Sequence, residues 1–287
     1  MPSTESKRRS GSGWAQFRRI VSFKRKHLCI PYILFLALFV IIPIIIILVY
    51  AFTRTTETGQ LEFSFDALKE FFSSTTKLNV LLVSLFIGLV NTLLCLLIGY
   101  PIAYLLADKR VNKNYVMVML FIMPMWINFV LRTGATRDVL YMMGIKGGQH
   151  PYLATLIGLL YNYLPFTILP LYTTMIKLDK SQIEAAKDLG CNPAQTFVHS
   201  ILPQTVPGIV SAAEMVFMPT MSSYVISDTL SEGKLTLFGN SIASSFNNSL
   251  WNDGSFMALV MLVLIFLTMF ITNRFHKDET QERGRLW

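Results

Sequence analysis

Long blocks of apolar residues constrain the fold of this chain more than any other feature of its sequence. Each block is close to the ~20 residues that a helix needs to cross a bilayer core of ~30 Å. With 53% hydrophobic and 15% charged residues among 287, the chain lies outside the usual balance of a soluble domain. We therefore predict an all-α integral membrane protein with six transmembrane helices. The predicted spans are Ile30–Phe52, Leu78–Leu106, Tyr115–Leu131, Tyr152–Ile176, Pro207–Asp228 and Phe256–Thr272.

The basic residues lie between and outside these blocks. Residues 1–29 contain eight Lys and Arg, residues 107–114 and 177–206 three each, and residues 273–287 four. Because Lys and Arg concentrate in cytoplasmic segments, we expect these four segments, and so both termini, in the cytoplasm. The net charge of +8 then indicates membrane topology and no nucleic-acid partner.

We expect three parts along the chain. Residues 1–29 form a cytoplasmic basic amphipathic segment, residues 30–273 a six-span membrane domain, and residues 274–287 a cytoplasmic tail. In the first part, apolar residues recur at helical spacing among Arg and Lys, which favours a helix held on the inner surface by anionic lipid. A disordered basic tail is the alternative for residues 1–12. The apolar residues are Trp14, Phe17, Ile20 and Val21.

The residue types of catalytic and metal sites are scattered. The histidines share no spacing that favours a metal site or a nucleophile and base pair, and the cysteines are expected to be free thiols. The sequence also lacks the Gly-rich loop that holds ATP phosphates. We expect no enzyme activity and no cofactor bound by this chain. These residues are His27, His150, His199, His276, Cys29, Cys95 and Cys191.

The segment 177–206 has the most informative local pattern. Ser181 is a capping residue with Glu184 three positions later, the spacing of a capping box at the start of a helix. Gly190 is expected to end that helix in a left-handed backbone conformation. The pattern predicts a short helix followed by a tight turn.

A second short helix is expected directly after the turn. Asn192 suits its N-cap and Pro193 its first turn, and Pro203 and Pro207 are expected to end it. The two helices form a small projection whose apolar residues lack an obvious partner within the loop, so a soluble partner is expected to cover them. These residues are Leu189, Phe197 and Ile201.

Glu184-Ala185-Ala186, followed by Gly190 and Leu202-Pro203, resembles the EAA loop of binding-protein-dependent ABC importer permeases. Ser200 departs from the isoleucine common in that family, and Ile201 is adjacent. The resemblance implies the type I ABC importer permease fold, with this loop seated in a groove of a cytoplasmic ATPase. The residues it assigns to coupling are Glu184, Ala185, Ala186, Gly190, Phe197, Leu202 and Pro203.

Further motifs resemble the spermidine/putrescine importer permeases, in particular the B-type membrane subunit. This resemblance implies a bacterial cell membrane, a second permease of C type, a dimer of ATPase subunits that binds ATP and Mg, and an extracellular polyamine-binding protein. The motifs are Leu97–Tyr104, Pro124–Asn128, Leu164–Tyr172, Lys177–Lys180 and Tyr224–Asp228.

Glu214 is a charged residue in the fifth apolar block. An ionised group in hydrocarbon is costly and usually faces water or a partner, so Glu214 is a candidate for the substrate path. The equal alternative is a structural carboxylate near the cytoplasmic end, hydrogen-bonded to a neighbouring helix.

Asp228 and Tyr224 are one helical turn apart at the outer end of the same block, where they offer charge and an aromatic face to an ammonium group. Trp126 offers a ring from the third span. Tyr224 and Trp126 also suit ordinary interface aromatics, and for Asp228 an ordinary position at the interface is the equal alternative. Arg132, Arg137 and Asp138 are expected just outside the third span, where they either contact the binding protein or mark the membrane interface.

Two other function classes remain. A permease of the same superfamily for iron(III), sulfate or phosphate would share the loop but not the substrate. An ion-driven secondary transporter would need no ATPase and would show inverted repeats with broken helices, which the sequence does not display.

Overall fold

The chain divides into two structural units in the computed structural model, which describes residues 29–55, 60–108 and 115–284. The first unit ends at Val49. In it, α2 (Cys29–Leu36) continues through the π-helical turn η2 (Ala37–Ile41) into α3 (Ile42–Ala51). None of residues 31–49 is buried. A helix that is apolar on all sides and unburied needs lipid or another chain around it, as expected for the first span.

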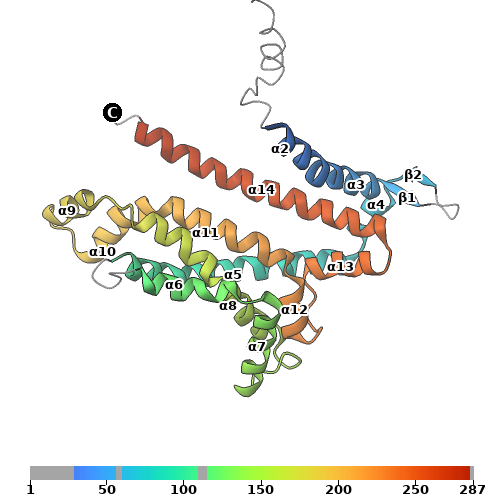
Figure 1. Cartoon of the computed structure of the whole chain (residues 1–287), viewed down its shortest axis with the longest axis horizontal. Helices are drawn as coiled ribbons and strands as arrows, with labels where there is room; N and C mark the ends of the chain where they lie inside the picture. The colour runs from blue at the N-terminus through green and yellow to red at the C-terminus, as the bar shows by residue number, and fades with distance from the viewer. Residues whose placement is uncertain (1–28, 56–59, 109–114, 285–287) are drawn as a thin grey trace, which may run out of the picture. The chain divides into compact units, whose positions relative to one another are not determined.

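The second unit supplies the other helices that are long and apolar enough to cross a membrane. Four are single helices, and a bent pair counts as a sixth span, so the described residues contain five such helices or up to six spans. The fold class predicted from the sequence is therefore confirmed. The ranges are Thr75–Ala107, Val116–Trp126 with Phe129–Met142, Pro151–Met175, Pro193–Ser222 and Trp251–Thr272 (Figure 1).

Three helices form the centre of the second unit: α5 (Thr75–Ala107), α8 (Pro151–Met175) and α11 (Leu202–Ser222). Small residues allow their backbones to approach closely. A Cβ atom at Gly99 of α5 would lie 2.8 Å from Thr167 Cγ2 of α8. One at Gly208 of α11 would lie 2.6 Å from the Thr174 hydroxyl of α8. The close crossing of these helices therefore depends on glycine at both contacts.

A smaller apolar cluster lies at one end of the second unit, around the buried ring of Phe71 on α4 (Asp66–Ser73). It includes Phe238 of α13 (Phe238–Asn247) and Phe256 of α14 (Trp251–Gly284), with ring centroids 6.2 and 5.5 Å from that of Phe71. Lys77 also joins α5 to α14, because its ammonium lies 2.6 Å from Asp253 Oδ1. The antiparallel strands β1 (Thr53–Thr55) and β2 (Leu61–Phe63) precede this cluster in the chain.

The third span is not the single helix predicted over Tyr115–Leu131. It consists of α6 (Val116–Ile122) with the 3-10 turn η3 (Met123–Trp126), and then α7 (Phe129–Met142) after a bend of 98° (Figure 1). Pro124 lacks a backbone N–H, and Asn128 caps a new helix by accepting from the amides of Val130 and Leu131. These two residues explain the break.

Arg132 of α7 is buried at this bend, not outside the span as expected from the sequence. Its Nε donates to Asn162 Oδ1 and its Nη1 to the Pro124 carbonyl oxygen, both at 2.8 Å. The guanidinium also lies 5.8 Å from the centre of the Tyr161 ring. Arg132 therefore fixes the bend to the middle of α8.

The fifth span also differs from the predicted Pro207–Asp228. A continuous helical run starts at α10 (Pro193–Thr196), passes through the π-helical turn η4 (Phe197–Ile201) and continues as α11. The amide of Leu202 donates to the Phe197 carbonyl, five residues earlier, and Pro203 occupies the first turn after this wide turn. The prediction that Pro203 and Pro207 end a short helix is therefore wrong, because the altered backbone register accommodates Pro203.

The outer part of the predicted fifth span is a separate helix. Ser223 has an extended backbone (ψ 97°) that ends α11, and α12 (Tyr224–Ser231) begins after it. Asp228 thus lies on α12 and not on the spanning helix. At the far end of the chain, α14 starts five residues before the predicted Phe256 and continues as helix to Gly284, through most of the predicted tail.

Candidate functional site

The loop predicted to couple to an ATPase begins with the helix α9 (Lys180–Asp188). Its N-cap is Asp179, whose Oδ1 accepts from the Ser181 amide at 3.0 Å and from the Ser181 hydroxyl at 2.6 Å. The predicted cap, Ser181, is instead in the first turn, because the Asp179 carboxylate is placed to accept both bonds. The Ser181 hydroxyl and amide hold the pKa of Asp179 below its usual value.

Gly190 ends α9 as predicted. Its φ is +84°, and its amide donates to the Lys187 carbonyl at 2.9 Å while the Cys191 amide donates to the Ala186 carbonyl at 3.1 Å. A Cβ atom at this position would meet nothing within 4 Å. Backbone conformation, and not lack of space, therefore favours glycine here.

The predicted cap of the second helix is confirmed. Asn192 Oδ1 accepts from the Gln195 amide at 2.8 Å, and Gln195 Oε1 accepts from the Asn192 amide at 2.9 Å. This reciprocal capping box, with Pro193 at the first helical position, fixes the start of α10. The turn between α9 and α10 is therefore defined by its own residues.

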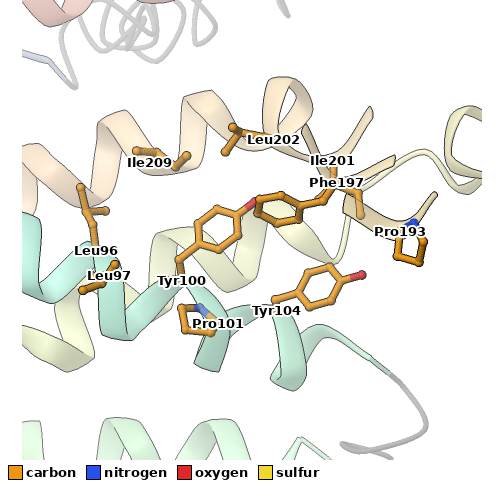
Figure 2. Close-up of a pocket in the computed structure, with 10 residues that line it drawn as sticks. All are labelled: Leu96, Leu97, Tyr100, Pro101, Tyr104, Pro193, Phe197, Ile201, Leu202 and Ile209. Atoms are coloured by element: carbon orange, nitrogen blue, oxygen red, sulfur yellow. The ribbon is translucent and has the colours of Figure 1, made fainter. Parts of the chain in front are cut away.

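The second half of the loop packs against the membrane helices. The ring of Phe197 meets the ring of Tyr100 on α5 edge to face, with centroids 5.7 Å apart. The Tyr100 hydroxyl is 2.9 Å from the Thr205 hydroxyl on α11. Figure 2 shows both rings at a cavity of about 610 Å³ that is also lined by Ile201 and Leu202. Phe197 and Ile201, expected to need a soluble partner, therefore contact their own chain.

The α9 surface, in contrast, is largely uncovered in the described part of the chain. No residue of α9 is buried, Glu184 and Ala185 are exposed, and the Leu189 side chain just after it is 86% exposed. Ala186 is half-buried and Pro203, at the other end of the loop, is exposed. The loop thus offers a surface of small residues with a carboxylate and a leucine beside them.

The four residues predicted for a substrate path lie on three different elements. Tyr224 and Asp228 are both exposed on α12, one turn apart, and Glu214 is half-buried on α11. Trp126 is 88% exposed beside the bend that Arg132 holds to the middle of α8. Within the described residues, no hydrogen bond or ion pair joins the four side chains.

Buried polar contacts between the helices are a feature that the sequence reasoning did not include. Asn91 of α5 donates to the Thr220 hydroxyl of α11 at 2.9 Å, and Asn162 of α8 accepts from Arg132. Both asparagines are fully buried. An amide inside an apolar block is the signal that would have identified them, because it needs a partner in a membrane helix bundle.

Comparison with known proteins places these features in a family. The family of binding-protein-dependent transport system inner membrane components matches residues 81–279. A permease of the spermidine/putrescine transport system, PotB of Haemophilus influenzae, is 34% identical over 260 residues, covering 84% of this chain and 90% of that protein. Escherichia coli PotB is 34% identical over 208 residues, covering 67% and 76%.

A solved structure shares the fold. A chain of a bacterial ABC transporter involved in the import of the acidic polysaccharide alginate aligns with a TM-score of 0.61 and 17% identity, over 91% of this chain and 98% of that one. At this identity the likeness concerns the fold alone. Together with the match over residues 81–279, these relatives show that the chain belongs to the family of binding-protein-dependent transport system inner membrane components.

Proposed function

We propose that this chain is the B-type permease subunit of an ATP-driven importer of polyamines such as spermidine and putrescine. The observation that carries the proposal is the 34% identity over 84% of the chain to a permease of the spermidine/putrescine transport system. Family membership and the exposed EAA loop support the importer class. The chain is a transport subunit, and ATP with Mg binds to a separate ATPase.

The assembly contains three kinds of partner. A C-type permease completes the membrane path, a dimer of ATPase subunits binds in the cytoplasm, and an extracellular protein delivers the polyamine. Both termini lie in the cytoplasm, as the distribution of Lys and Arg favours. The basic residues of segment 1–29, all within residues 1–28 and so outside the described residues, contact anionic lipid.

Coupling uses the surface of α9. Glu184, Ala185 and Ala186 enter a groove of the ATPase, where the small side chains allow close approach. Gly190 sets the angle between α9 and α10. Because α10 continues through η4 into α11, a displacement of α10 reaches the spanning helix without an intervening loop. Contacts of Phe197 and Leu202 support this connection, and Pro203 lies in the first turn of α11.

The path for the cation passes the residues that offer carboxylates and rings. Trp126 projects from the break of the third span, and irregular backbone at membrane depth is tolerated where it faces protein or water. Asp228 and Tyr224 of α12 supply a carboxylate and an aromatic ring for an ammonium group.

The test is uptake of radiolabelled spermidine and putrescine into vesicles that contain this chain with its co-purified partners, with and without ATP. We expect ATP-dependent uptake of at least one of the two amines. Uptake of neither amine would refute the polyamine assignment and leave iron(III), sulfate or phosphate to be assayed. Uptake that is independent of ATP would refute the importer class.

A further inference from the structure

A cavity of about 260 Å³ lies between α5, α11 and α14, away from the loop and from the bend of the third span. Its wall is mostly apolar, with side chains such as Leu89, Phe217 and Ile271. Glu214 of α11 is its carboxylate, and three threonines of the two other helices supply hydroxyl groups. These are Thr92, Thr268 and Thr272.

The cavity lies midway along the helices and is open to the outside of the bundle, where Leu89 and Leu93 are 54% and 58% exposed. Thr92 is close to the middle of α5 (Thr75–Ala107), and Glu214 is in the interior of α11, eight residues before its end at Ser222. The interpretation of Glu214 as a structural carboxylate near the cytoplasmic end therefore does not fit its position.

Glu214 makes no hydrogen bond or ion pair with any other described residue. The threonine hydroxyls do not serve it, because each donates its proton to a backbone carbonyl of its own helix. Thr92 donates to Gly88 at 2.7 Å, Thr268 to Ile265 at 2.8 Å and Thr272 to Thr268 at 2.7 Å. A half-buried carboxylate without a partner in a membrane-spanning helix needs water or a cation.

The polar groups of the cavity therefore all accept hydrogen bonds. An ionised carboxylate accepts only, and a hydroxyl whose proton is engaged offers only its lone pairs. Such a site suits a cation that carries N–H donors and disfavours an anion. The apolar wall, which includes the Phe217 ring, adds a surface for methylene groups.

We propose that this cavity binds an alkylammonium group of the transported polyamine, with Glu214 as its counter-ion and the threonine oxygens as further acceptors. The proposal rests on the proposed function and adds a specific site between α5, α11 and α14. It also disfavours sulfate and phosphate as cargo, because the hydroxyl donors that line the cavity are all engaged with backbone carbonyls.

The experiment replaces Glu214 by glutamine, which keeps the volume and removes the charge. In vesicles with the complete complex and saturating binding protein, we expect initial spermidine uptake to fall about tenfold in Glu214→Gln, the effect of losing one charge-assisted contact. ATP hydrolysis should stay near that of the unmodified complex, because the coupling loop is intact. Glu62→Gln, at an exposed carboxylate of β2, is the matched control and should import normally.

A second pair of variants separates the site from a structural role. Adding Thr268→Glu to Glu214→Gln returns a carboxylate to the same cavity from α14, and we expect it to recover most of the uptake. Thr268→Lys in the otherwise unmodified chain places an ammonium in the cavity and should reduce uptake, which gives an independent test if Glu214→Gln does not assemble.

The outcomes distinguish this inference from the proposed function. Normal polyamine uptake by Glu214→Gln or by Thr268→Lys would overturn the site and leave the importer assignment intact. Loss of uptake that Thr268→Glu does not recover would also overturn it, in favour of a structural role for Glu214. An unmodified complex that imports no polyamine would overturn the proposed function, and the site with it.

Discussion

Replacement of Gly190 by alanine tests whether the angle between α9 and α10 controls coupling. The glycine has φ +84°, and a Cβ atom there would meet nothing within 4 Å, so the whole effect comes from backbone conformation. A non-glycine residue in this region costs about 1–2 kcal/mol, which corresponds to roughly a fivefold to thirtyfold shift towards other loop conformations. We expect ATP-dependent uptake to fall by several-fold.

Gly144 provides a matched control for this prediction. It has φ +83°, and a Cβ atom there also meets nothing within 4 Å, but it lies in the connection between α7 and α8. Gly144→Ala therefore imposes the same local strain far from the loop in sequence. Gly190→Asn is a second control, because asparagine tolerates the left-handed conformation better than alanine and should retain more uptake.

The assay compares uptake, ATP hydrolysis and co-purification of the subunits in the same vesicles. The expected result for Gly190→Ala is an assembled complex whose uptake is reduced relative to Gly144→Ala. Equal uptake by the two alanine variants would refute the reasoning, since strain at the turn would then have no specific consequence. Gly190→Pro should abolish uptake, because proline fixes φ near −65° and cannot adopt the φ of +84° found here.

Three further predictions concern hydrogen bonds within the chain. Tyr100→Phe removes a hydrogen bond to α11 and should cost about 1 kcal/mol, measured as a lower unfolding temperature in detergent, and an unchanged temperature would contradict that contact. Asn162→Leu leaves the buried Nε of Arg132 without its acceptor and should cost about 1–3 kcal/mol in the same measurement, more than the exposed control Asn248→Ala. The pKa of Asp179 is lowered in the folded chain, so its capping contribution is complete above the ordinary carboxyl pKa of about 3.9 and is lost as the pH falls through the lower folded value. After correction for intrinsic rates, hydrogen exchange of the Ser181 amide should therefore accelerate below about pH 4 in the unmodified chain but not in Asp179→Asn. If the exchange rates of the two chains change equally with pH, the assignment of Asp179 as the cap is contradicted.

The parts of the fold set by local pattern could be predicted from the sequence. Apolar blocks located the spans to within several residues for most helices, because an uninterrupted apolar helix has few alternatives to lipid. The turn at Gly190 and the cap at Asn192 followed from residue types with strong backbone preferences. The cap of α9 was misplaced from Asp179 to Ser181 because both residues are good caps and lie two positions apart.

Features that depend on contacts across the bundle could not be predicted in this way. The break at Pro124 is stabilised by Arg132, whose side chain reaches α8 thirty positions further along the chain. The continuation of the fifth span through Pro203 depends on a wider helical turn, which the proline alone does not reveal. The contact of Phe197 with its own chain could not be predicted for the same reason, because its partner Tyr100 lies on a helix distant in sequence.

The π-helical turn η4 has a consequence for insertions and deletions in this chain. The helical run Pro193–Ser222 has 30 residues, or about 45 Å at 1.5 Å per residue. Removing one residue from η4 would convert it to regular α-helix and rotate everything on its α10 side by about 100° relative to α11. Phe197 would then turn away from Tyr100. The rotation of the loop about the helix axis, relative to α11, therefore depends on a single extra residue.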